Sequence, residues 1–147
     1  MLTRARILEL IPHKGTMCLL DEAVGWSDAT ITCRAQSHLS PDNPLRRNGG
    51  LAGLCGIEYG LQAAALHGAI VAGGPQPTGY LAALRSVEIF AARLDCPSFG
   101  KLEVTAQLEL RDMGGLIYGF RLRSAAGADL LGGRATIVLS ATVGGLA

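Results

Sequence analysis

The sequence lacks an excess of charge of either sign. Its 147 residues include 13 Lys and Arg against 12 Asp and Glu, which gives a formal net charge of +1 at pH 7. Proteins that bind nucleic acid or anionic lipid usually carry a basic excess, so this balance supports neither kind of partner. The basic start does not lead into a signal-peptide core either, because Glu9, Pro12 and His13 interrupt the residues that follow.

Cysteines are few and widely spaced. The four are Cys18, Cys33, Cys55 and Cys96, and no two form a CxxC pair. No group of His and Cys has the spacing of a metal site. We therefore expect reduced thiols, a cytoplasmic protein and no metal.

The composition is that of one ordinary globular domain. Hydrophobic residues make up 49% of the chain and charged residues 17%, with no repeat, linker or low-complexity segment. The one long apolar stretch, 51–72, contains Glu58, Gln62 and His67. Charged and polar side chains are costly at mid-membrane, so we expect a helix buried in protein and no membrane span.

The spacing of apolar residues predicts a short helix, two strands, a loop, a long helix and then four strands. A short helix over 2–10 ends at Pro12, and a long helix over 51–71 ends at Gly73-Gly74-Pro75. A loop rich in Pro, Asn and Gly occupies 40–50 between them. The predicted strands cover 17–24, 29–37, 79–94, 102–110, 116–124 and 130–139.

These elements indicate an α+β domain over residues 1–147. The last three strands are joined by short Gly-containing turns, which is typical of an antiparallel meander. The long helix is rich in Gly and Ala, so a sheet can approach it closely. A curved antiparallel sheet wrapped around one apolar helix is the hotdog fold, and we expect that fold here.

Three segments resemble the 3-hydroxyacyl-acyl carrier protein dehydratases. Residues 10–21, with Ile-Pro-His-Lys and then Leu-Leu-Asp, are similar to the opening signature of that family. Residues 53–63 resemble its central-helix signature, in which an acidic residue follows a Gly by five positions and a Gln follows the acid by four. Residues 79–87 resemble the start of its third strand. The opening and the loop 42–47 look most like a divergent subgroup encoded in aryl polyene and related pigment gene clusters.

The resemblance implies dehydration of a 3-hydroxyacyl thioester to the trans-2-enoyl thioester in fatty acid or polyene-type biosynthesis. In the family a His removes the α-proton, an acidic residue on the central helix protonates the departing hydroxyl, and a backbone N–H polarises the carbonyl. Carried over, Glu58 matches the acid and Gly53 the N–H donor, while Gln62 could hold the Glu58 carboxyl. Burial among apolar residues is expected to raise the pKa of Glu58 toward that of a useful acid.

The position of the family's histidine is Pro44 in this sequence. The nearest histidine is His38, at the end of a predicted strand, and we take it as the candidate base. His13 belongs to the opening signature, but the resemblance does not make it the base. The substrate would be carried on the phosphopantetheine of acyl carrier protein or coenzyme A, with no further cofactor. Arg46 and Arg47 are candidate contacts for an acidic carrier protein.

Family members form dimers in which each site takes side chains from two subunits. We expect a homodimer or a dimer of dimers, with a heterodimer with another hotdog subunit as an alternative. Two other functions stay open. One is a hotdog thioesterase that uses Glu58, and the other is a non-catalytic acyl-binding subunit that pairs with an active dehydratase.

Overall fold

The computed structural model of the chain describes residues 1–139. The helices are α1 (Arg4–Leu10) and α2 (Gly56–Ala72), with short 3-10 turns at Gly15–Met17, Ser37–Leu39, Gly53–Cys55 and Pro97–Phe99. The strands are β1 (Leu2–Thr3), β2 (Glu22–Trp26), β3 (Thr30–Ala35), β4 (Gly79–Ile89), β5 (Leu102–Arg111), β6 (Gly115–Arg123) and β7 (Asp129–Leu139).

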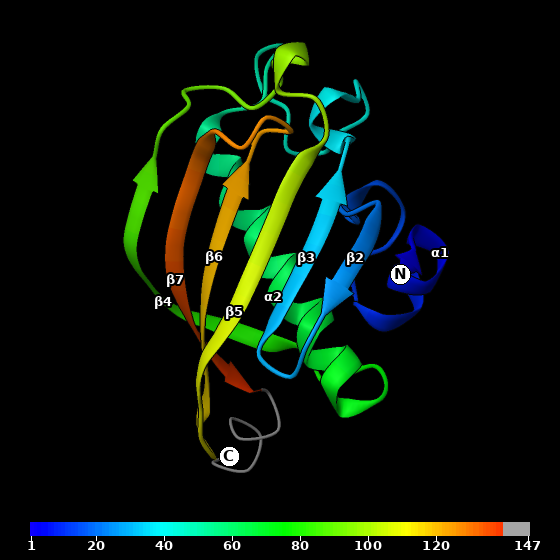
Figure 1. Cartoon of the computed structure of the whole chain (residues 1–147), viewed down its shortest axis with the longest axis vertical. Helices are drawn as coiled ribbons and strands as arrows, with labels where there is room; N and C mark the ends of the chain where they lie inside the picture. Colours follow the sequence, from blue (N-terminus) through cyan, green and yellow to red (C-terminus); the bar gives the residue numbers. More distant parts are fainter. Residues whose placement is uncertain (140–147) are drawn as a thin grey trace.

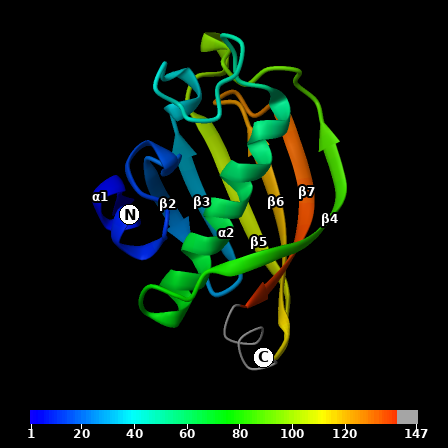
Figure 2. The same ribbon diagram turned by 180° about the vertical axis from the view of Figure 1, so that it is seen from behind.

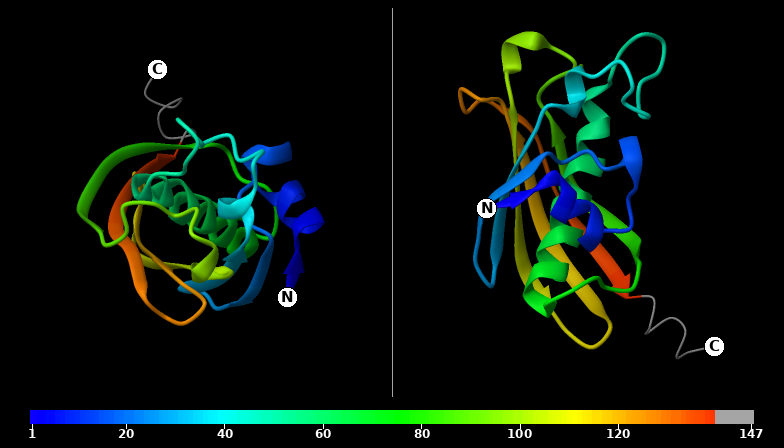
Figure 3. Two further views of the ribbon diagram at one scale, coloured as in Figure 1. Left: turned by 90° about the horizontal axis from the view of Figure 1, so that it is seen from above. Right: turned by 90° about the vertical axis from the view of Figure 1, so that its right-hand side faces the viewer.

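One antiparallel sheet of seven strands forms the body of the molecule, in the order β1-β2-β3-β5-β6-β7-β4 (Figure 1). The sheet curves around α2, as the view from above shows (Figure 3, left). From behind, α2 lies in front of the sheet and the start of β4 passes across its lower end (Figure 2). This is the hotdog fold, and the expected fold class is confirmed.

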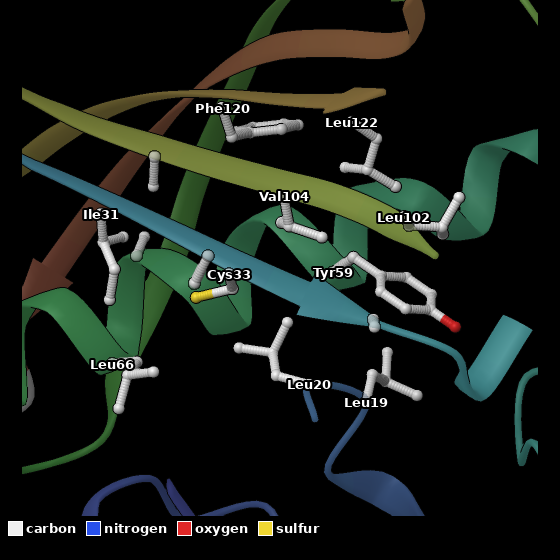
Figure 4. Packing of buried hydrophobic residues seen from close by; sticks show 14 of the residues in the cluster. Leu19, Leu20, Ile31, Cys33, Tyr59, Leu66, Leu102, Val104, Phe120 and Leu122 are labelled. Atoms are coloured by element: carbon white, nitrogen blue, oxygen red, sulfur yellow. The ribbon is translucent and has the colours of Figure 1, made fainter. Parts of the chain in front are cut away.

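Small residues on α2 determine how closely the helix approaches the sheet. A Cβ at Gly56 would meet the side chains of Leu122 and Leu131, and a Cβ at Gly60 would collide with Phe120. The core on this side is made by inward-facing residues of β3, β5 and β6 that point at the helix (Figure 4). They include Ile31, Cys33, Val104, Phe120 and Leu122.

The predicted elements match the observed ones in kind but not in every bound. The helix expected over 2–10 begins at Arg4 because Leu2–Thr3 forms β1, the long helix begins at Gly56 and not at 51, and β4 ends at Ile89, short of the predicted 94. The largest difference lies near residue 20. The segment expected as a strand over 17–24 begins with the last residue of the 3-10 turn Gly15–Met17, and β2 begins only at Glu22. Cys18, Leu19 and Leu20 are fully buried but lie outside any strand. An apolar run signals burial, and here burial comes from packing against α2 without strand pairing.

The apolar helix is a core element. Among the described residues, Gly53–Ala72 is the segment with the length and composition of a membrane span, and half of it is buried inside the fold. His67 is accommodated in this core by two hydrogen bonds. Its Nε2 donates to the Ser27 carbonyl at 2.9 Å, and its Nδ1 shares a hydrogen bond of 2.7 Å with the Tyr118 hydroxyl.

Strand β4 is one edge of the sheet and is poorly covered. It pairs with β7 alone, and its residues are exposed except at two half-buried positions. Leu81, Leu84 and Ile89 face the α2 side of the sheet, where they pair in register with inward residues of β7. Their exposed fractions are 47%, 38% and 46%, so this edge presents an apolar surface to solvent within the single chain.

Candidate active site

A cavity of about 530 Å³ runs along one face of α2. The helix contributes residues that are mostly three or four positions apart, which places them along a single face. They are Glu58, Leu61, Ala64, Ala65, Gly68 and Ala72. From Glu58 to Ala72 the helix rises by about 21 Å. The opposite wall comes from the start of β4 and from β6 and β7, and most of it is apolar.

Glu58 and His13 meet at one end of this cavity. Nε2 of His13 lies 3.4 Å from Oε1 of Glu58. The two side chains are 26% and 33% exposed, so the pair is half-buried but reachable from solvent. Glu58 lies in the first turn of α2, where the dipole of the helix favours a negative charge.

The segment that carries His13 is held in place by side chains on either side of it. Arg4 donates to the carbonyls of Gly15 at 2.8 Å and Cys18 at 2.7 Å. Gln62 on α2 donates to the Met17 carbonyl at 2.8 Å and accepts from the Leu19 N–H at 2.9 Å. The approach of this segment to α2 is therefore specified by several hydrogen bonds, most of them to backbone groups that no strand satisfies.

The pKa of Glu58 is held below its ordinary value. The largest cause is the hydrogen bond from His13, burial acts in the opposite direction, and a hydrogen bond from Gln62 lowers the pKa further. Nε2 of Gln62 is 3.5 Å from Oε1 of Glu58, longer than its bond to Met17. The expectation that burial would raise the pKa of Glu58 is therefore wrong, because the donors around the carboxylate outweigh desolvation.

Gly53 does not present a free N–H to the cavity. Its N–H donates to the Ala92 carbonyl at 2.8 Å, in a short ladder in which the Leu94 N–H also donates to the Leu51 carbonyl. A Cβ at position 53 would collide with the Ala91 carbonyl oxygen, so glycine is needed here for close backbone approach. This corrects the expectation that the Gly53 N–H polarises a substrate carbonyl, since the chain itself satisfies that donor.

His38 is fully buried and is absent from the lining of the cavity that contains Glu58. Neither of its ring nitrogens has a hydrogen-bond partner among the described residues. Burial lowers the pKa of His38 against two opposing effects: a contact with the backbone of Gly100, which falls short of hydrogen-bond geometry, and the charges of Asp21 and Asp95. The structure thus does not bring His38 and Glu58 together within one chain, and a role for His38 across a subunit interface stays a prediction.

A buried polar cluster ties the loop 40–50 to α2. The Tyr59 hydroxyl lies 2.8 Å from the Ser37 hydroxyl and accepts from the Asn43 amide at 3.1 Å. Burial is the main cause that raises the pKa of Tyr59 to about 12, so the hydroxyl stays protonated. Tyr59, the residue after Glu58 on α2, thereby anchors the loop.

The two arginines of this loop differ in their surroundings. Arg46 is half-buried, donates to the Gly49 carbonyl at 3.1 Å and lies 3.8 Å from the Asp95 carboxylate. Arg47 is exposed and donates to the carbonyls of Pro44 and Arg46. Arg93 also contacts Asp95, at 2.7 Å, so the guanidinium groups of Arg46 and Arg93 share one carboxylate.

His13 is the residue whose position could not be inferred from local sequence. It lies 45 positions before Glu58, and no periodicity relates the two. The one available signal was the opening Ile-Pro-His, which belongs to the same signature as the segment that packs on α2.

Comparison with known proteins gives a family and a fold. A family model of the ApeP dehydratases matches residues 5–141. No curated protein matches the sequence. Among solved structures, the dehydratase heterocomplex ApeI:P from Xenorhabdus doucetiae matches with a TM-score of 0.78 at 22% identity, over 90% of each chain.

Two further solved structures share the fold at lower similarity. A hypothetical thioesterase from Streptococcus pneumoniae, in a structure with coenzyme A, has a TM-score of 0.59 at 14% identity, over 80% of this chain and 84% of that one. The PaaI protein from the phenylacetic acid degradation operon of E. coli has a TM-score of 0.59 at 10% identity, over 80% of this chain and 81% of that one.

Proposed function

Because the chain belongs to the ApeP-like dehydratase family, we propose that it removes water from a 3-hydroxyacyl thioester and gives the trans-2-enoyl thioester. The observation that carries this proposal is the position of Glu58. Its carboxylate lies at the end of an apolar cavity, half-buried, with hydrogen-bond donors on two sides. Elimination of water requires proton transfer at adjacent carbons, and a positioned carboxylate can perform it.

The cavity suits an acyl chain. Its helical wall is built from small residues beyond Leu61, which leaves space alongside α2 for an extended aliphatic group. Its length along the helix, about 21 Å, accommodates a long chain while the thioester end stays beside Glu58. The reaction as proposed needs no metal or redox cofactor, since elimination requires only proton transfer and stabilisation of the developing enolate.

We further propose that the acyl group arrives on the phosphopantetheine arm of acyl carrier protein in the cytoplasm, as part of fatty acid or polyene-type biosynthesis. Arg46 and Arg93 contact the carboxylate of Asp95, and the exposed Arg47 follows Arg46 in the loop, which leaves a net positive charge at the helix-entry end of the molecule. Such a cluster suits an acidic protein surface. Coenzyme A presents the same arm and is the alternative carrier.

The active assembly is proposed to contain two hotdog subunits. Apolar residues on the α2 side of edge strand β4 are exposed, and an exposed apolar edge strand is usually covered by another strand or element. A second subunit placed there would also lie next to the cavity, because Gly79 and Leu81 of β4 line its wall. The partner is a second copy or a related subunit; the similar ApeI:P structure is described as a heterocomplex.

A thioesterase is the second candidate, and one observation favours it. With its pKa lowered, Glu58 is ionised at neutral pH and could activate water or attack the thioester carbonyl. The absence of a histidine at position 44 agrees with this alternative as well, since such a reaction does not need that residue.

The test is an assay that follows both possible products. The purified chain, alone and mixed with a second hotdog subunit, is given a 3-hydroxyacyl thioester on acyl carrier protein and on coenzyme A. Enoyl thioester is measured by mass spectrometry and free thiol by a colorimetric reagent. We expect enoyl product that disappears in Glu58→Gln and persists in the control Glu9→Gln, which removes an exposed carboxylate paired with Arg6.

The other outcomes identify the alternatives. Free thiol that depends on Glu58 would replace the dehydratase with a thioesterase. Stable association with a second hotdog subunit, together with turnover that does not change in Glu58→Gln, would make the chain a non-catalytic acyl-binding subunit.

A further inference from the structure

The contact between His13 and Glu58 bears on whether Glu58 begins the reaction by accepting a proton or by donating one. The donor in this contact is Nε2 of His13, because an ionised carboxylate only accepts. Nδ1 of His13 is buried and has no partner among the described residues. Nε2 is therefore the one ring nitrogen of His13 with a partner, and that partner is the Glu58 carboxylate.

Few other charged groups reach this end of the cavity. Lys14 follows His13, but its ammonium group is bound to the carbonyls of Leu8 and Ile11. The other charged residues that line the cavity are Arg111 and Asp112, at its far end near the start of β6. On α2, Gln62 adds a second donor, its side-chain amide. The groups that reach Glu58 are thus the His13 ring and the Gln62 amide, and both stabilise the carboxylate.

We propose that Glu58 starts the elimination as a carboxylate that accepts the α-proton, and that His13 is the positioning residue that holds it in this state. The inference rests on the proposed dehydratase function. The C2–H bond breaks and its proton moves to the free oxygen of Glu58, while the electron pair enters the thioester as an enolate. The pair then forms the C2–C3 double bond as the C3–O bond breaks.

The same proton leaves with the hydroxyl group as water, and Glu58 returns to its ionised form. One carboxylate therefore acts first as base and then as acid, so the cycle closes with no second titrating side chain. This accounts for the presence of Pro44 in place of a histidine and for the burial of His38 away from the cavity. It also gives a purpose to the hydrogen bonds from Arg4 and Gln62 that fix the His13 segment against α2.

Two variants separate positioning from simple loss of structure. His13→Ala removes the donor, and His13→Gln keeps an N–H donor that does not titrate. Carbon-13 NMR of the Glu58 carboxyl should show titration at a higher pH in His13→Ala than in the wild type, with His13→Gln close to the wild type. An unchanged Glu58 titration in His13→Ala would overturn the positioning role, and this readout does not depend on turnover.

The pH profile of kcat/KM tests the direction of proton transfer, in whichever assembly is active. We expect activity to rise as Glu58 ionises and then to stay level, with the rising limb moved to higher pH in His13→Ala and restored in His13→Gln. Activity that falls as Glu58 ionises would make Glu58 the initial acid and refute the inference while leaving the dehydratase in place. Absence of any dehydration by the wild type would refute the proposed function itself, and the inference with it.

Discussion

Replacement of Gly60 by Ala should destabilise the protein, whereas the same change at Gly68 should not. Both glycines lie inside α2, so both substitutions gain about 0.8–1 kcal/mol of helix propensity. They differ in what the new methyl group meets. At Gly60 it would lie 2.6 Å from Cγ and 2.9 Å from Cβ of Phe120, while at Gly68 the nearest atom is the Tyr118 hydroxyl at 4.0 Å.

The clash at Gly60 cannot be relieved by a small rotation. Cβ and Cγ are the root of the Phe120 side chain, and the ring is enclosed between α2 and the sheet at 5% exposure. Overpacking of this kind costs about 1–3 kcal/mol. We take the upper end of this overpacking cost and subtract the gain in helix propensity. Gly60→Ala should then lower the free energy of unfolding by about 1–2 kcal/mol. Gly68→Ala should raise it by about 0.5–1 kcal/mol.

Thermal and urea unfolding at equal protein concentration measure this difference. For a domain of this size 1 kcal/mol corresponds to about 2–4 °C, so the two variants should differ in Tm by about 3–12 °C. Equal Tm values, or a more stable Gly60→Ala, would refute the packing of α2 on β6 described above. Gly68→Ala also adds a methyl group to the wall of the cavity, so it should weaken binding of long acyl chains while it stabilises the fold.

Three further changes test other parts of the molecule. His38→Leu should leave stability at neutral pH unchanged or higher, because neither ring nitrogen has a partner in the described structure. Because the pKa of His38 is lowered in the folded chain, the unfolded chain binds a proton at this residue first as the pH falls below about 6.5. The free energy of unfolding of the wild type, measured in urea, should therefore fall with acid through that range more than that of the variant. Tyr59→Phe should cost about 1–3 kcal/mol by leaving Ser37 and Asn43 without a common partner, and faster amide exchange in the loop 40–50 should accompany the loss. Leu84→Asp, on the exposed apolar side of β4, should reduce subunit pairing in analytical ultracentrifugation without unfolding the chain, and an unchanged assembly would exclude this edge as the interface.

The sequence by itself determined the fold class of this protein. Alternation along 102–110 and the short Gly-containing turns that follow are local signals, and they specify an antiparallel meander without reference to distant residues. The long apolar run 51–71, broken by Gly73, predicted the central helix in the same way. The place of Glu58 within that helix also followed from sequence, because a carboxylate in an apolar helix has few explanations other than a functional one.

Tertiary structure decided what surrounds that carboxylate. The proximity of His13 to Glu58 depends on Arg4 and Gln62, which hold a segment without regular strand pairing against the helix. Satisfaction of the Gly53 N–H by Ala92 depends on where the chain returns after β4. The strength and direction of a pKa shift depend on the balance between burial and nearby donors, and that balance exists only once residues far apart in the chain are folded together.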